Sequence, residues 1–129
     1  PASEPSSSSA EIGGVDIAGP LTPELVDELR GALLEHHVLV FRNQSLTHED
    51  QVRFAQWFGE LQVHPFVEAS PHHPEVIELI TEADEASTFS GGWHADLTCL
   101  EAPVLGSILY GVELAVVGGD TLFANQQAE

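Results

Sequence analysis

The sequence predicts an α+β fold with helices near the amino terminus and short strands after them. Two segments, 22–36 and 47–59, repeat apolar residues at helical spacing. Shorter apolar stretches at 38–41, 76–80 and 104–114 are separated by turns that contain Gly or Pro. Helices followed by short strands of this kind favour a sheet sandwich or barrel that begins in the second half of the chain.

The amino-terminal segment 1–10, PASEPSSSSA, is rich in Pro and Ser. We expect it to be a disordered tail, because it offers almost no apolar surface to bury. The next residues, 11–19, read EIGGVDIAG and predict a short strand that glycines interrupt before a turn.

The first helix is expected to start after Thr22, whose hydroxyl can cap it, with Pro23 at the first helical position. The helix should end near His36 and His37, where a protonated imidazole suits the negative end of the helix dipole. Its predicted buried face recurs every four residues, at Leu25, Leu29 and Leu33, and Val26 and Leu34 widen it.

The run VLVF at 38–41 predicts a buried strand, and a second helix is expected after it. The spacing of Thr47 and Asp50 is that of a helix amino terminus, and Gly59 suits the carboxyl end. Beyond this helix, 61–67 should be extended and 76–80 a strand. The polar segment 81–92 is expected to be a long loop of the kind that carries function.

Composition limits the function. Three basic and 21 acidic residues give a net charge of −18, which argues against nucleic-acid binding and against an electrostatic hold on anionic membranes. No apolar run approaches a membrane span of about 20 residues, and the first residues lack a signal-peptide pattern. A cytoplasmic protein is therefore expected.

The single cysteine, Cys99, excludes an intrachain disulfide, and we expect its thiol to be buried.

The sharpest motif is Trp93-His94-Ala95-Asp96. On an extended strand, alternate residues share a face, so an H-x-D pair presents an imidazole beside a carboxylate. These are two of the three ligands of a 2-His-1-carboxylate iron site. Roughly one in three random chains of this composition would contain such a pair, so spacing alone also fits a solvated histidine next to an aspartate.

The remaining histidines carry less information. His48 should be an exposed residue of the first helical turn, and His72 and His73 should lie in a solvated turn between prolines. His64 lies in a mostly apolar segment before Pro65, and both a structural and a substrate-facing role fit it. The Gly118-Gly119-Asp120-Thr121 segment predicts a hairpin turn, because glycine readily adopts positive φ.

Taken in order, several segments resemble the TauD/TfdA family of Fe(II)- and 2-oxoglutarate-dependent dioxygenases. The matching segments are IGGVDIAGPL, HHVLVFRNQSLTHEDQVRFAQWFGEL, VHP, WHADLT and APVLGSILYGVELAVVGGDTLFAN. They cover residues 11 to 125 in the family's order, and the WHAD and GGDTLF segments are the most specific of them.

The resemblance implies a double-stranded β-helix, the cupin-like jelly roll, preceded by the helices. It also implies that His94 and Asp96 are Fe(II) ligands and that Thr121 contacts a carboxylate of the co-substrate 2-oxoglutarate. His64 matches a position that contacts an anionic substrate group in members acting on taurine or sulfate esters. Val67 and Ser90 stand where taurine-oxidising members place an aromatic hydroxyl and an amide, which makes taurine itself a poor fit.

The family takes a second His ligand and a carboxylate-binding Arg from a later segment, whereas this sequence has no His after His94 and no Arg after Arg53. We therefore expect residues 11–129 to be the amino-terminal part of the domain, truncated before the second half of the barrel and inactive alone. Partners would be O₂, 2-oxoglutarate and a complementing carboxyl-terminal half or a second copy.

For the complete enzyme, the resemblance implies hydroxylation of a small anionic organic substrate, with release of succinate and CO₂. The candidates are a sulfonate, a sulfate ester and an aryloxy or alkyl carboxylate. Two alternatives stay open: a non-catalytic binding module that assembles with a partner chain, and a metal-dependent hydrolase that uses His94 and Asp96.

Overall fold

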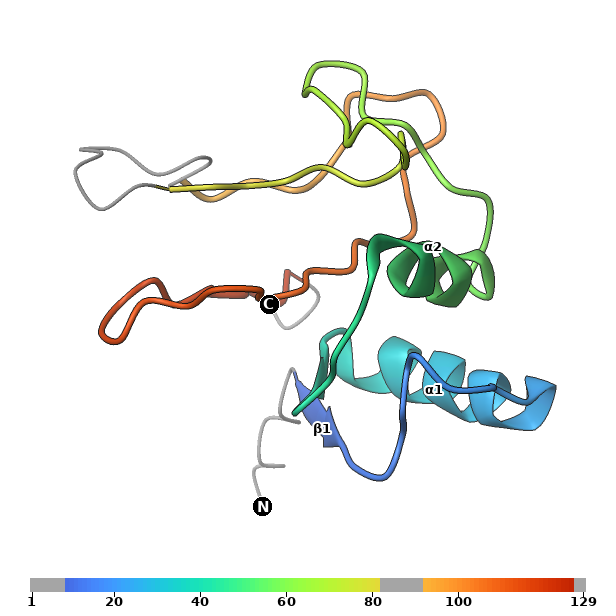
Figure 1. Cartoon of the computed structure of the whole chain (residues 1–129). Helices are drawn as coiled ribbons and strands as arrows, with labels where there is room; N and C mark the ends of the chain where they lie inside the picture. The colour runs from blue at the N-terminus through green and yellow to red at the C-terminus, as the bar shows by residue number, and fades with distance from the viewer. Residues whose placement is uncertain (1–8, 82–91, 127–129) are drawn as a thin grey trace. The chain divides into compact units, whose positions relative to one another are not determined.

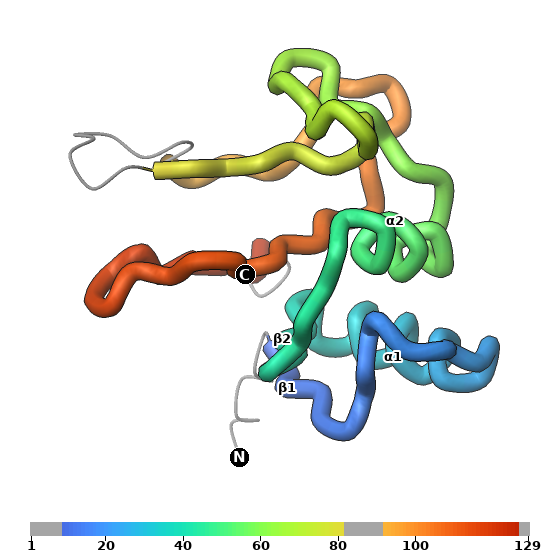
Figure 2. Tube along the Cα trace, viewed as in Figure 1, coloured from blue at the N-terminus to red at the C-terminus, as the bar shows by residue number. Residues whose placement is uncertain are grey.

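The computed structural model describes residues 9–81 and 92–126 and contains two units. The first unit is Pro1–Thr47 together with Tyr110–Glu129, and the second is His48–Leu109. The elements follow the order β1, α1, β2 and α2 along the chain, as the colours of Figure 1 and the labels of Figure 2 show. No helix in the described ranges is long and apolar enough to cross a membrane.

A small parallel sheet is the centre of the first unit. Strand β1 (Ala10–Ile12) pairs with β2 (Leu39–Phe41) so that Ala10 faces Leu39 and Ile12 faces Phe41 (Figure 2). Parallel neighbours need a crossover connection, and helix α1 (Pro23–His36) supplies it. Ala10 therefore belongs to the sheet rather than to the predicted tail, whereas residues 1–8 lie outside the described ranges.

Helix α1 has the predicted bounds, and its two ends explain them. The Thr22 hydroxyl accepts a hydrogen bond from the Leu25 amide at 3.3 Å, and Pro23 opens the helix. At the other end, His37 adopts a left-handed conformation with φ 63°, and its amide donates to the Leu33 carbonyl at 2.8 Å. Val26 and Leu29 of the predicted face are buried, together with Ile17, whereas Leu34 is exposed and that part of the prediction is wrong.

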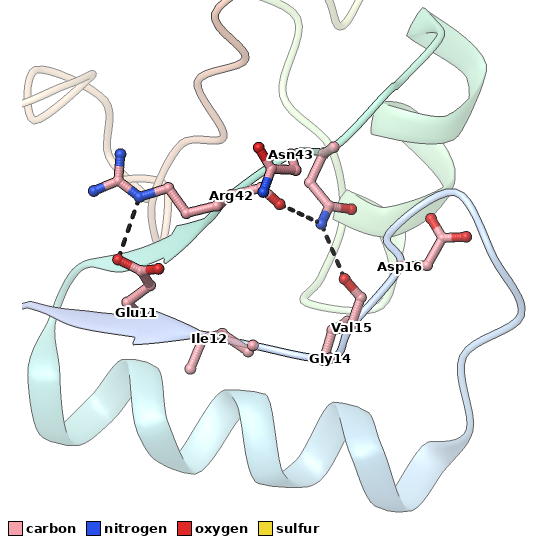
Figure 3. A pocket seen from close by; sticks show the side chains of 9 residues that line it. Glu11, Ile12, Gly14, Val15, Asp16, Arg42 and Asn43 are labelled. Atoms are coloured by element: carbon pink, nitrogen blue, oxygen red, sulfur yellow. Dashed lines mark hydrogen bonds and ion pairs between the residues drawn. The ribbon is translucent and has the colours of Figure 1, made fainter.

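Gln44 ties together the loops that follow the two strands. Its side-chain oxygen accepts from the Ile17 amide at 2.9 Å, and its amide nitrogen donates to the carbonyls of Val15 and Arg42, each at 3.0 Å (Figure 3). An open hollow of about 440 Å³ lies beside these loops, where Arg42 pairs with Glu11 at 3.2 Å. Glu11, Arg42 and Gln44, three of the polar residues that line this hollow, thus bond to other lining residues.

A tyrosine at its start connects the carboxyl-terminal segment of the first unit to the loop after β2. The Tyr110 hydroxyl accepts from the Leu46 amide at 3.4 Å and donates to the Gln44 carbonyl at 3.5 Å. Beyond it the chain extends and doubles back (Figures 1 and 2, red). Gly118 and Gly119 have φ values of 79° and 75°, which confirms the predicted glycine turn.

Helix α2 (His48–Gln56) opens the second unit and begins, as predicted, immediately after Thr47. It ends three residues before Gly59, because Trp57 and Phe58 donate to Phe54 and Ala55 in a tightened last turn. Phe54 is buried and meets the Phe58 ring edge-on, with 5.3 Å between the centroids.

The prediction of further strands is wrong for the described residues. Within 9–81 and 92–126, β1 and β2 are the only strands, and the segments 76–80 and 104–114 form none. Segment 61–67, predicted to be extended, bends at 65–67. A strand exists only where a neighbour pairs with it, and here Ile80, Leu105 and Leu109 stay exposed. The α+β class therefore holds for the described residues, whereas a jelly roll is not formed by them.

Candidate metal site

His94 and Asp96 come together in the second unit. The Nε2 atom of His94 lies 3.2 Å from Oδ1 of Asp96, and each side chain is 51% exposed. The segment is not a strand, because a turn begins at Asp96, Leu97 has φ 50° and the Leu100 amide donates to the Leu97 carbonyl. The turn brings the two side chains to one side, as the predicted strand would also have done.

Each of the two side chains has a second partner on its far side. The Nδ1 atom of His94 lies 2.8 Å from the Gly92 carbonyl oxygen. Since a carbonyl only accepts, the hydrogen bond assigns a proton to Nδ1, and in the neutral ring Nε2 then carries the lone pair. The Ser107 hydroxyl donates to Oδ2 of Asp96 at 3.0 Å. Nε2 and Oδ1 therefore face each other.

This donor set fits a divalent metal ion. Imidazole nitrogen and carboxylate oxygen bind such ions at about 2.0–2.2 Å, so two ligands at adjacent corners of a coordination sphere are about 3 Å apart. A metal-bound histidine also characteristically donates its other ring N–H to a carbonyl or carboxylate. Across residues 9–81 and 92–126, however, no group of three His, Cys, Asp or Glu side chains could hold a metal. The described part of the chain thus offers two ligands.

The other expected site residues lie apart from this pair in the sequence. Thr121 belongs to the first unit and is exposed after the glycine turn. His64 and Val67 belong to the second unit and are half-buried. Ser90 lies outside the described residues.

His64 forms a local turn of its own. Its Nδ1 atom accepts a hydrogen bond from the Phe66 amide at 3.2 Å, and its ring meets the Phe66 ring edge-on at 6.2 Å. An amide only donates, so Nδ1 carries the lone pair and the proton of the neutral ring lies on Nε2. His64 and His94 therefore have opposite tautomers: His64 offers an N–H donor and His94 a lone pair.

Sequence reasoning missed a second cluster in this unit. His48 was expected to be exposed, but its Nε2 lies 3.8 Å from Oε1 of Glu78 and its Nδ1 3.4 Å from the Ser70 hydroxyl. The His73 ring meets it edge-on at 5.9 Å. A turn at 70–76 supports this arrangement: the Ser70 amide donates to the Val76 carbonyl, and the Val76 amide donates to the His73 carbonyl.

The prediction of a buried Cys99 is wrong, because the cysteine is exposed.

Comparison with known proteins places the chain in a family. The sequence profile described as "Taurine catabolism dioxygenase TauD, TfdA family" matches residues 2–128. The chain belongs to the TauD/TfdA family.

Two curated proteins are similar to this chain in sequence. An alkylsulfatase from Acinetobacter baylyi is 36% identical over 119 residues, which are 92% of this chain and 37% of the relative. An alpha-ketoglutarate-dependent sulfate ester dioxygenase from Pseudomonas putida is 34% identical over 120 residues, 92% of this chain and 39% of the relative. The chain thus spans less than two fifths of the length of either protein.

Among solved structures, a taurine dioxygenase from Burkholderia xenovorans is similar to part of the chain. The sequence identity is 43% and the TM-score 0.48, and the match covers 51% of this chain and 24% of that protein.

Proposed function

We propose that this chain supplies two Fe(II) ligands, His94 and Asp96, to a 2-oxoglutarate-dependent dioxygenase that acts on a small anionic organic substrate. The observation that carries the proposal is the 3.2 Å approach of His94 Nε2 to Asp96 Oδ1, with the histidine tautomer set by Gly92. It occurs in a chain that matches the TauD/TfdA family over residues 2–128. When bound, the iron would supply the O₂ chemistry that links 2-oxoglutarate decarboxylation to substrate oxidation.

The chain's own residues would hold and orient the reactants. In the neutral ring, an Nδ1–H that donates to Gly92 leaves the lone pair of His94 on Nε2, where a metal would bind, and Asp96 presents Oδ1 on the same side. Thr121 belongs to the other unit, and its proposed hydrogen bond to a carboxylate of 2-oxoglutarate rests on the family match. Further ligands would come from a longer protein that contains this chain or from a second chain.

We propose an anionic substrate because of His64. Its Nδ1 accepts from the Phe66 amide, so that Nε2 can donate to a sulfate, sulfonate or carboxylate oxygen. Val67 is half-buried immediately after the hydrogen-bonded turn and favours an apolar tail over an amine. The assignment of Ser90 to the substrate site rests on the family match alone, because Ser90 lies outside the described residues. Two relatives named for alkyl sulfate and sulfate ester chemistry agree with this class.

A jelly roll in the longer protein would explain the exposed apolar residues of the carboxyl-terminal segment. Val112, Val116 and Val117 are 83%, 101% and 89% exposed in the structure. Strands that pair with this segment and a layer that covers it would bury such side chains. The same surface also supports a second candidate, a non-catalytic module that assembles with a partner chain.

Mn(II) binding tests the proposed site, because Mn(II) accepts the same nitrogen and oxygen ligands and its free concentration is read by electron paramagnetic resonance. We expect weak binding to the chain that His94→Ala and Asp96→Ala each abolish. His72→Ala is the matched control, since His72 is an exposed histidine in a turn. Binding that survives both site substitutions would contradict the metal site and favour the non-catalytic module.

A further inference from the structure

A serine distant in the sequence holds the carboxylate of the candidate site. The Ser107 hydroxyl donates to Oδ2 of Asp96 at 3.0 Å, across eleven positions of the sequence. His94 faces the other oxygen, Oδ1, at 3.2 Å. The two oxygens of one carboxylate therefore have different partners, a hydroxyl on one side and an imidazole on the other.

Helix α2 fixes the backbone that carries this serine. The side-chain amide of Gln51 donates to the carbonyl of Ile108 at 2.9 Å, one residue beyond Ser107. The helix itself is anchored by the buried ring of Phe54. A connection thus runs from α2 through Gln51 and Ile108 to the serine hydroxyl, and from there to Asp96.

We propose that Ser107 is a positioning residue that holds Oδ2 of Asp96 and so directs Oδ1 toward the metal beside His94 Nε2. This inference rests on the proposed function. Because the hydroxyl occupies one lone pair of Oδ2, the carboxylate is oriented to bind the metal through one oxygen, which leaves more of the coordination sphere for other ligands. Partners that orient metal ligands in this way affect metal affinity by about 10- to 100-fold.

Removal of the hydroxyl should loosen the carboxylate without disturbing the core, because Ser107 is exposed. In the metal-free chain, we expect a single Asp96 side-chain rotamer in the wild type and rotamer averaging in Ser107→Ala, measured by three-bond couplings to the carboxyl carbon. Ser107→Thr keeps a hydroxyl and should restore the single rotamer. Ser45→Ala removes an exposed hydroxyl from the other unit and should change nothing.

Mn(II) affinity provides the second measurement. We expect Ser107→Ala to weaken Mn(II) binding about tenfold and Ser107→Thr to recover most of it. Gln51→Ala, which releases Ile108, should lower the affinity in the same direction and broaden the Asp96 rotamer distribution.

The two measurements separate the possible failures. An Asp96 rotamer distribution that Ser107→Ala leaves unchanged would overturn the positioning role. So would an unchanged Mn(II) affinity in Ser107→Ala when Asp96→Ala lowers it. Mn(II) affinity that even Asp96→Ala leaves unchanged would instead overturn the proposed function, and with it the metal-directed part of this inference.

Discussion

The Nδ1 atom of His94 lies 2.8 Å from the carbonyl oxygen of Gly92. In the neutral ring this contact decides which nitrogen carries the lone pair, because a carbonyl oxygen can only accept a hydrogen bond. Nε2 is then the atom that faces Asp96. A backbone carbonyl two residues away thus places the proton of the neutral imidazole on Nδ1. The Asp96 carboxylate at 3.2 Å favours a cation at Nε2, either a proton or a metal ion.

The 129-residue chain alone should not form succinate from 2-oxoglutarate. The described residues offer two ligands in one place and no group of three, and a metal held by two side chains binds weakly. The assay is succinate release under O₂ with Fe(II) and a panel of sulfate esters and carboxylates. Succinate formation by the wild-type chain that Asp96→Ala abolishes would contradict this prediction.

Local signals in the sequence predicted the helices well. Thr22 and Pro23 lie next to the helix that they start, so the beginning of α1 needs no tertiary information. The strand at 38–41 was also predictable, apart from its parallel partner at Ala10–Ile12. The run at 76–80 has the apolar character of a strand, yet pairing depends on a neighbour that its own residues do not specify.

The candidate site also has a part that local sequence signals predicted and a part that they did not. The spacing of His94 and Asp96 predicted that the two side chains would meet, whereas their metal role stays a prediction. Ser107 was missed because its contact with Asp96 depends on Gln51, which holds the neighbouring carbonyl of Ile108. No periodicity links these residues. The partners of His48 were missed for the same reason, since Ser70 and Glu78 lie more than 20 residues further along the chain.

The two faces of helix α1 should differ sharply in their contribution to stability. Leu29 is 3% exposed and Leu34 is 67% exposed. We expect Leu29→Ala to lower the free energy of unfolding by about 2–5 kcal/mol, through lost burial and a residual cavity. Leu34→Ala should change it by less than about 0.5 kcal/mol. Urea denaturation followed by circular dichroism measures both, and equal effects would refute the assigned core.

The amino-terminal cap of α1 offers a finer test. Thr22→Ala removes the oxygen that accepts from the Leu25 amide. We expect a loss of about 0.5–2 kcal/mol in the free energy of unfolding, because one amide at the helix start loses its partner. Thr22→Ser keeps the hydroxyl and should retain most of the stability. A Thr22→Ser variant as unstable as Thr22→Ala would show that the methyl group, rather than the hydrogen bond, matters.

Self-association of the chain should increase with salt. The apolar side chains of Val112, Val116 and Val117 are almost fully exposed, and the net charge of −18 opposes their contact. Raising the ionic strength from about 0.01 M to about 1 M shortens the Debye length from about 30 Å to about 3 Å and removes most of that repulsion. Sedimentation velocity measures the mass distribution. A monomer at both salt concentrations would contradict the prediction, and Val116→Asp should weaken any association seen.

His64 should determine the affinity for anionic substrates, and its two nitrogens allow a sharp test in a longer, active protein that contains this chain. Asparagine can replace Nδ1 as the acceptor for the Phe66 amide but carries no donor at the position of Nε2. We therefore expect His64→Asn to keep the turn and still raise KM about 10- to 100-fold, which corresponds to a charge-assisted hydrogen bond of about 1.5–3 kcal/mol. A binding role predicts a smaller change in kcat. His72→Ala, at an exposed histidine, is the control. A KM that His64→Asn leaves unchanged for every anionic substrate would reduce His64 to a structural residue of the turn.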